Sequence, residues 1–369
     1  MSRWVGLLAV LLGTGVSPSL AQEAATQTVT VQGRVLDAET NAPLPETHVF
    51  ITQTMNGTVT DSTGGFHLNE VRPGVKRLYA SRVGHTNKAF RFRATPGRTQ
   101  VVTLRLTPEV LQSPPVTVSA ERDEEWSDRL ARFKRLFVGK AGPARQCVLV
   151  NPEVLQFEER WWGRFEAQAE KPIVIENRAL GYRLTYFLKE FEKSGSVVRW
   201  DGEPLFERLT PQDSSEAARW RRNRRAAYRG SLRHFLRALL ADQLDEERFD
   251  LYRLPRASSL RHTNHADRMP VERDRILEPG PDSTHLLNTH DRLEVVYRGE
   301  PEREAYLDWA ALRRRPRDHQ TSQIELNQHP IHVDRYGEIV ESYGATLYRY
   351  FAYTARMAQL LPREYEPPE

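Results

Sequence analysis

The chain has 369 residues, of which 39% are hydrophobic and 28% charged, and its formal net charge at pH 7 is +4. The hydrophobic content, with 7 Trp, 13 Tyr and 14 Phe, is enough for packed cores and excludes an intrinsically disordered chain. The length fits two domains of ordinary size, and the single cysteine excludes an intramolecular disulfide.

The first residues predict an export signal. Arg3 precedes an apolar stretch at 5–12, and Ser19-Leu20-Ala21 supplies the small residues that a signal peptidase recognises. We therefore expect residues 1–21 to be removed and the mature protein to lie in the periplasm, at the outer membrane or outside the cell. An uncleaved anchor is the alternative, but a bilayer span takes about 20 apolar residues. No later segment is apolar enough for a transmembrane helix.

Residues 28–108 are predicted to form an antiparallel β-sandwich. Short segments alternate apolar and polar residues, so that Val102, Leu104 and Leu106 share one face. Turn signals separate the segments, among them Asn56-Gly57, a pair suited to a tight hairpin because both residues tolerate positive φ. Such patterning is typical of sheets with one buried and one solvated face.

The order of these segments resembles the carboxypeptidase regulatory-like domain. The resemblance rests on GRVLDAETNAPLPETHVFI, NGTVTDSTGGFHLNEVRPG and LYASRVGH, which follow one another along the chain. It implies a transthyretin- or immunoglobulin-like sandwich, in a family that occurs in bacterial surface proteins and at the front of outer-membrane transporters. His85 departs from the family, which usually has an aromatic residue after the glycine. We expect this change to alter the packing of one loop and to leave the fold intact.

His67 and Glu70 have the spacing of two zinc ligands in carboxypeptidases. Strand alternation places Phe66 and Leu68 inward, His67 on the opposite face and Glu70 on the inward face, so that the two candidate ligands do not converge. We therefore expect a non-catalytic scaffold or docking unit without metal or cofactor.

Residues 109–125 are rich in proline, serine and acids and predict an extended linker. Residues 126–362 predict a larger α+β domain, because helices and strands mix without a βαβ rhythm. We expect helices at 126–137, 216–228, 232–244 and 347–361, a surface loop at 254–283, and strands elsewhere. The stretches NPEVLQF, IENRALGYRLTYFLKEF and AAYRGSLRHFLRAL resemble the sequence that follows this sandwich in uncharacterised bacterial envelope proteins, and this resemblance implies no activity.

An arginine cluster in and after the helix at 216–228 is the candidate binding site. Guanidinium groups match phosphate, sulfate and carboxylate. For an exported protein this favours an envelope protein or an anionic envelope component, such as a lipid phosphate or an acidic glycan, over nucleic acid. A solvated face with internal ion pairs is the alternative. The candidate residues are Arg221, Arg222, Arg225, Arg229 and Arg233.

Other polar pairs have simpler explanations than catalysis. Ser231 and His234 could pair as nucleophile and base, but Ser231 also suits the N-cap of the following helix. Two HxxH pairs could bind a divalent metal, although Pro330 keeps the second pair out of a helix. Trp161-Trp162 could stack on sugars. Cys147 is expected to be a buried hydrophobe, with a reactive thiol as the alternative. The pairs are His262 with His265 and His329 with His332.

These observations favour an exported, non-catalytic binding or structural protein. A secreted hydrolase of peptides or glycans, with its site in the second domain, is an alternative that needs convergent acids or metal ligands. An accessory component of a TonB-linked uptake system is a further alternative, which rests on analogy with the transporter members of the family.

Overall fold

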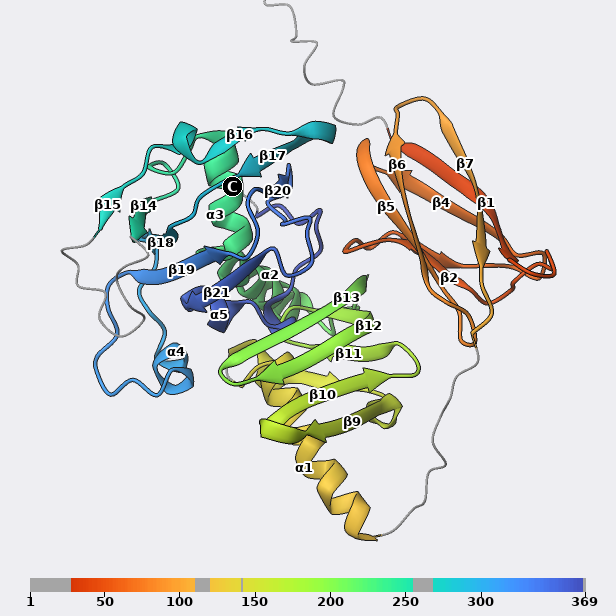
Figure 1. Ribbon diagram of the computed structural model, residues 1–369, viewed down its shortest axis with the longest axis horizontal. Helices are drawn as coiled ribbons and strands as arrows, with labels where there is room; N and C mark the ends of the chain where they lie inside the picture. The colour runs from red at the N-terminus through yellow and green to blue at the C-terminus, as the bar shows by residue number, and fades with distance from the viewer. Residues whose placement is uncertain (1–27, 110–119, 141, 255–267, 368–369) are drawn as a thin grey trace, which may run out of the picture.

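The computed structural model describes residues 28–109, 120–140, 142–254 and 268–367 (Figure 1). The N-terminal unit is a β-sandwich of two sheets with the strand orders β4-β1-β7 and β3-β2-β5-β6. Its strands are β1 (Val29–Asp37), β2 (His48–Ile51), β3 (Gly57–Val59), β4 (Gly65–Val71), β5 (Gly74–Ser81), β6 (Lys88–Ala94) and β7 (Thr99–Leu106). The export signal predicted for residues 1–21 lies outside the described residues.

The alternation predicted for the sandwich is confirmed in its core. Val102, Leu104 and Leu106 of β7 are buried against the facing sheet. The neighbour of β7 in its sheet is β1, and these two strands run parallel, whereas the other strand pairs of the sandwich are antiparallel. The close approach of the two strands requires Gly33, because a Cβ at this position would lie 1.7 Å from the carbonyl oxygen of Val102.

The prediction that Glu70 points into the sandwich is wrong. The register between β1 and β4 shifts so that Val31 faces Leu68 while Val29 faces Val71, which leaves an extra residue in β4. Glu70 occupies this bulge with φ of 57° and is exposed, as His67 is. Strict alternation fails here because a bulge moves every following side chain to the other face.

The second unit begins with helix α1 (Ala120–Phe137), so the last residues of the predicted linker are helical. Phe133 and Phe137 of α1 are fully buried, and the helix is followed by Gly139 with φ of 122°. They pack on a sheet in which β12 pairs with β13 along one side and with β11 and then β10 along the other. Its strands are β8 (Cys147–Leu149), β9 (Leu155–Arg160), β10 (Arg164–Ala169), β11 (Ile173–Asn177), β12 (Tyr182–Ser194) and β13 (Val197–Arg208).

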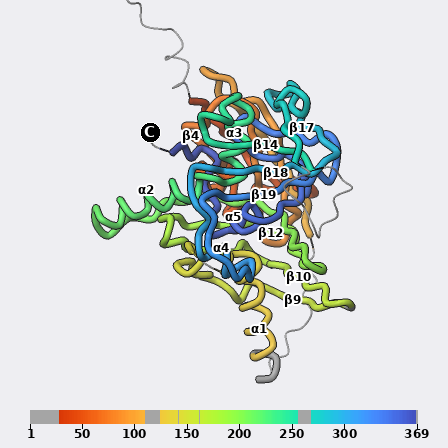
Figure 2. Tube along the Cα trace, turned by 90° about the vertical axis from the view of Figure 1, so that its left-hand side faces the viewer, coloured from red at the N-terminus to blue at the C-terminus, as the bar shows by residue number. Residues whose placement is uncertain are grey.

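A second core of this unit lies between α3 and two further antiparallel sheets. Helices α2 (Ser214–Tyr228) and α3 (Leu232–Ala241) lie where helices were predicted, and α2 projects from the body of the molecule (Figure 2). The strands are β14 (Phe249–Leu254), β15 (Met269–Pro270), β16 (Leu277–Pro279), β17 (Thr284–Leu287), β18 (Arg292–Tyr297), β19 (Gln320–Leu326), β20 (Ile331–Asp334) and β21 (Ala345–Arg349), with α4 (Glu304–Trp309) between β18 and β19.

The helix predicted at 347–361 is wrong except for α5 (Tyr350–Thr354). The residues before it form β21, which pairs with β19, and Arg349 turns the chain with φ of 58°. Pairing with an existing sheet outweighs local helical periodicity here. Part of the loop predicted at 254–283 also forms short strands, β15 and β16, while residues 255–267 lie outside the described residues.

The architecture is thus an N-terminal sandwich followed by a larger, mostly β unit with few helices, within the predicted α+β class. No helix in the described part of the chain is long and apolar enough to cross a membrane.

Candidate functional site

The sandwich is joined to the second unit by backbone hydrogen bonds at one loop. The N–H of Gln53 donates to the carbonyl of Pro204 on β13, and the N–H of Phe206 donates to the carbonyl of Thr54, both at 2.9 Å. On the other side of the loop, the N–H of Arg363 donates to the carbonyl of Gln53 at 2.7 Å. The loop is therefore held between β13 and the C-terminal segment.

An apolar cluster lies beside these hydrogen bonds. Phe50 and Tyr79 from the sandwich are buried against Phe187 and Leu205 from the second unit. The rings of Phe50 and Phe187 stack with their centroids 4.9 Å apart, a favourable geometry for two aromatic side chains. The two units consequently pack as one body rather than as independent units on a spacer.

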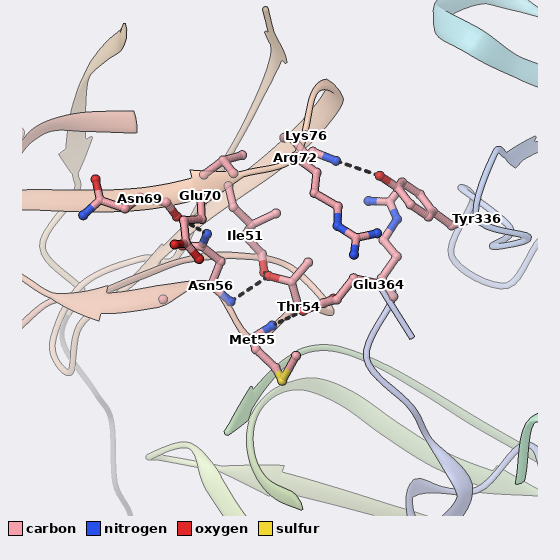
Figure 3. A pocket seen from close by; sticks show the side chains of 13 residues that line it. Ile51, Thr54, Met55, Asn56, Asn69, Glu70, Arg72, Lys76, Tyr336 and Glu364 are labelled. Atoms are coloured by element: carbon pink, nitrogen blue, oxygen red, sulfur yellow. Dashed lines mark hydrogen bonds between the residues drawn. The ribbon is translucent and has the colours of Figure 1, made fainter. Parts of the chain in front are cut away.

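Two hollows of about 390 and 400 Å³ lie at this junction. Both are lined by Lys76 of β5 and by Tyr336 and Arg363 of the second unit. Figure 3 shows the first hollow, in which the Lys76 side chain reaches across from the sandwich to Tyr336. Their size is that of small-ligand sites, and neither unit alone would form them. We refer to the two hollows together as the junction cleft.

Cationic groups surround Tyr336 at the centre of the cleft. The Lys76 Nζ donates to the Tyr336 hydroxyl at 3.1 Å, and the Arg335 Nη2 donates to the same oxygen at 2.6 Å. The guanidinium carbons of Arg335 and Arg363 lie 4.8 and 4.7 Å from the centroid of the ring. This tyrosine is therefore in contact with three cationic side chains.

Of the three cations at this centre, Arg363 pairs with Asp334. Lys76 is only 5% exposed, and among the described residues neither Lys76 nor Arg335 forms an ion pair with a carboxylate. Burial lowers the pKa of Lys76. Burial raises the pKa of Tyr336, but the charges of Lys76 and Arg335 outweigh it and hold that pKa below its ordinary value. The arrangement can bind an anion, and Tyr336 can donate its proton more readily than an ordinary tyrosine.

Two neighbouring side chains leave polar atoms unused at the cleft. Arg363 pairs with Asp334 through Nη2, while its buried Nε has no hydrogen-bond partner. Glu364 accepts the Met55 N–H at 2.8 Å through Oε1, while its buried Oε2 has no partner. Both side chains line the first hollow, and each keeps one buried polar atom without a partner.

The comparisons with known proteins bear on the sandwich. Residues 31–118 match the model of the CarboxypepD_reg-like domain. The sandwich is a CarboxypepD_reg-like domain. Its predicted family is therefore confirmed. No curated protein matches the chain.

Solved structures resemble the chain only weakly. A type II cohesin–X-dockerin complex from Acetivibrio cellulolyticus is 16% identical, over 30% of this chain and 74% of that one, with a TM-score of 0.20. A minor pilin from Streptococcus agalactiae is 14% identical, over 26% and 49%, with a TM-score of 0.20. A putative carbohydrate-binding protein from Bacteroides uniformis is 12% identical, over 51% and 69%, with a TM-score of 0.19. We draw no functional argument from similarities at this level.

The CarboxypepD_reg-like domain contributes to the cleft through β5, through the loop around Gln53 and through the end of β4, where Glu70 of the zinc-like HxxE spacing lines the first hollow. No group of three or more potential metal ligands occurs in the parts of the chain that the structure describes. His85, where the sequence departs from the family, lies with its Nε2 3.1 Å from the Asp37 carboxylate. The substitution joins a loop to the end of β1 and leaves the fold intact.

The structure separates the five arginines of the predicted site. Arg221 and Arg222 are exposed on α2, Arg225 is half-buried, and Arg229 is exposed at the end of the helix. Arg233 is buried and donates to Glu338 and to the carbonyl of Pro362, so it serves the packing of α3 on the C-terminal segment. An anion contact through the other four remains a prediction.

The side chains of Ser231 and His234 contact different groups and do not form a nucleophile–base pair. The Ser231 hydroxyl caps α3 by accepting the backbone N–H of His234 at 3.2 Å. The His234 ring accepts from the Gly230 N–H through Nδ1, and its Nε2 lies 2.9 Å from Glu247. The imidazole does not contact the hydroxyl, and the N-cap interpretation is confirmed.

Of the remaining sequence candidates, His332 lines the second hollow, whereas His329 and Trp162 line neither hollow. His332 lies on β20 with its Nδ1 2.5 Å from Glu341, and the ring of His329 lies 4.4 Å from that of His290. His262 and His265 lie outside the described residues. Trp162 is 96% exposed at the turn between β9 and β10, and sugar stacking at that turn remains a prediction.

Cys147 is expected to be unreactive in the folded protein. The thiol is half-buried, and burial raises its pKa to about 12, which leaves almost no thiolate at neutral pH. Alkylation by iodoacetamide at pH 8 should be slower than that of a free cysteine by roughly a hundredfold or more and should reach completion in urea. Rapid labelling of the native protein, followed by mass spectrometry, would contradict the buried assignment.

Proposed function

We propose that this chain is an exported, non-catalytic binding protein that holds a small ligand in the junction cleft. The observation that carries the proposal is the position of Lys76 and Tyr336, which come from different units and meet between two hollows of ligand size. The CarboxypepD_reg-like domain acts in this proposal as one wall of the site and also as a scaffold. Export rests on the signal-like residues 1–21.

The proposal is supported by how the cleft is built. Its walls are fixed by backbone hydrogen bonds and by a buried aromatic cluster, so the ligand-binding groups are organised before the ligand arrives, which reduces the entropic cost of binding. A packed interface without function would not require a buried ammonium between two hollows. Hydrophobic contacts of similar size would be as stable or more stable.

A bulky residue in the cleft should prevent capture of the ligand. Arg72 lines the first hollow and Val75 lines the second, and the double variant Arg72→Trp/Val75→Trp would fill much of both. The matched control is Arg98→Trp/Val101→Trp, because Arg98 and Val101 are exposed on the same sandwich and do not line the cleft. After incubation with envelope extract, native mass spectrometry should find a small-molecule adduct on the unmodified protein and on the control, and not on the cleft-filling double variant.

Two outcomes would contradict this prediction. An adduct that persists on Arg72→Trp/Val75→Trp at the same level would place binding outside the cleft. The absence of any small-molecule adduct on the unmodified protein would refute the binding function proposed for the cleft. Circular dichroism of both variants checks that each retains the β-rich fold.

A further inference from the structure

We propose that Lys76, Arg363 and Tyr336 bind the oxyanion of a small ligand, and that Glu364 binds an ammonium group of the same ligand. This inference rests on the function proposed for the cleft and adds the chemical class of the ligand. The class is a carboxylate or phosphate that carries an amine a few bonds away.

The first argument is the state of the lysine. Moving an ammonium group from water into a protein interior costs several kcal/mol unless a counter-charge accompanies it. Lys76 is 5% exposed, and its observed partner is the hydroxyl of Tyr336 rather than a carboxylate. The counter-charge that other buried cations obtain from the protein is missing here, and an anionic ligand would supply it.

The second argument is the unpaired donor on Arg363. Its Nη2 pairs with Asp334, whereas Nε is buried at the cleft without a partner. A buried donor without a partner is rare in native structures and calls for a specific explanation. A guanidinium group presents Nε and its neighbouring nitrogen in a fixed plane suited to oxyanions. An oxygen of the ligand would satisfy this nitrogen while another oxygen meets the Lys76 Nζ.

Tyr336 adds a donor at the same point. Its hydroxyl oxygen already accepts from Lys76 and from Arg335. A tyrosine hydroxyl that accepts twice still has its own proton to donate. Because both neighbours are cations, this proton is held less tightly than usual and makes a strong, charge-assisted hydrogen bond to an anion.

Glu364 indicates the second group of the ligand. Its Oε1 accepts the Met55 N–H, and Oε2 is buried in the lining of the first hollow without a donor. A simple anion would leave this carboxylate oxygen unsatisfied and would be repelled by it. A ligand with an ammonium group close to its oxyanion satisfies both sides of the hollow, whose volume of about 390 Å³ accommodates such a molecule.

The experiment is a calorimetric titration with four probes. Acetate and inorganic phosphate present an oxyanion alone. β-Alanine and O-phosphoethanolamine present the same two groups with an ammonium group two carbons away. For at least one of the two oxyanions, we expect the amine-bearing probe to bind at least about tenfold more tightly than the simple anion, because a charged hydrogen bond is added. If β-alanine gains more affinity over acetate than O-phosphoethanolamine gains over phosphate, the ligand is a carboxylate. The reverse result indicates a phosphate.

Variants of Lys76 and Glu364 test which group of the ligand each residue binds. Lys76→Met should weaken every probe that binds by at least about tenfold, whereas Lys88→Met, at an exposed lysine of the same sandwich, should change none of them. Glu364→Gln should bring the amine-bearing probe to the affinity of its simple anion, whereas Glu39→Gln, at an exposed glutamate, should not. Tyr336→Phe removes only the hydroxyl and repeats the oxyanion test if Lys76→Met does not fold.

Several results would overturn the inference. If none of the four probes binds the unmodified protein, the oxyanion site is wrong. If the amine-bearing probes bind no more tightly than the simple anions, or if Glu364→Gln leaves their advantage intact, the role of Glu364 is wrong. The test of the proposed function is separate, because the adduct captured from envelope extract and its loss in Arg72→Trp/Val75→Trp do not depend on these four probes.

Discussion

Replacement of Phe187 by alanine is expected to lower the free energy of unfolding by about 3–5 kcal/mol, the usual cost of truncating a buried phenylalanine. Phe187 is 4% exposed and packs against Phe50 and Tyr79 of the sandwich. The cavity would open between the two units, so the cost falls on their association. We expect urea unfolding of the variant, followed by tryptophan fluorescence and by circular dichroism, to separate into two transitions.

The matched control is Phe90→Ala. Phe90 lies on β6 of the sandwich and is 38% exposed, so the same change in side chain should cost much less. If the free energy of unfolding of Phe187→Ala lies within about 1 kcal/mol of that of the unmodified protein, Phe187 behaves as a solvent-exposed phenylalanine. The contact between the two units would then not persist in solution.

Lys76→Met should raise the stability of the unliganded protein at neutral pH by about 1–4 kcal/mol, since an apolar side chain of similar length replaces a buried charge without a counter-ion. The predicted loss of ligand affinity and this gain of stability would occur in one variant. Such opposition is common where a functional site is maintained at the expense of stability.

The pH dependence of this gain has a definite sign. The pKa of Lys76 in the folded protein lies below its ordinary value of 10.5, so the unfolded chain binds more protons between these two values, and stability rises with pH in that window. The gain from Lys76→Met is therefore full below the folded pKa and is lost as the pH rises to 10.5. Arg335, Arg363 and Tyr336 face the same ammonium group and remain in the variant.

Denaturant titrations at pH 7 and at pH 10.5 would measure this difference, with Lys88→Met as the control for loss of one positive charge. A variant that is less stable than the unmodified protein at pH 7 would show that the Lys76 ammonium is compensated in solution. In that case the argument that the Lys76 ammonium requires an anionic ligand would fail.

The sandwich could be predicted from the sequence because its information is local. Alternation in β7 depends on neighbouring residues, and the structure retains it. The tight turn predicted at Asn56-Gly57 is wrong, because residues 52–56 join β2 to β3, the positive φ falls at Gln53, and Gly57 already belongs to β3. Glu70 was misplaced because a bulge inserts one residue without a compositional signal. The helix expected at 347–361 failed because β19, a distant partner, draws the residues of β21 into a sheet.

The cleft could not be predicted in the same way. Lys76 and Tyr336 are 260 residues apart in sequence, and their meeting depends on how two units pack. One local signal existed, since Lys76 shares the strand parity of the core residues Leu78 and Ala80. A lysine at a core-facing position of a strand requires a partner from elsewhere. The arginines of α2 and α3 were more conspicuous, yet Arg233 on α3 proved to be part of the packing.

The contact between Met55 and Glu364 joins residues 309 positions apart. At a synthesis rate of about 5–20 residues per second, the second of these residues appears roughly 15–60 s after the first. The sandwich can fold during this interval, while the surface around Gln53 still lacks its C-terminal cover. A nascent chain would therefore expose Phe50 and Tyr79 to chaperones until Phe187 and Leu205 have been synthesised, and the loop around Gln53 until synthesis has passed residue 364.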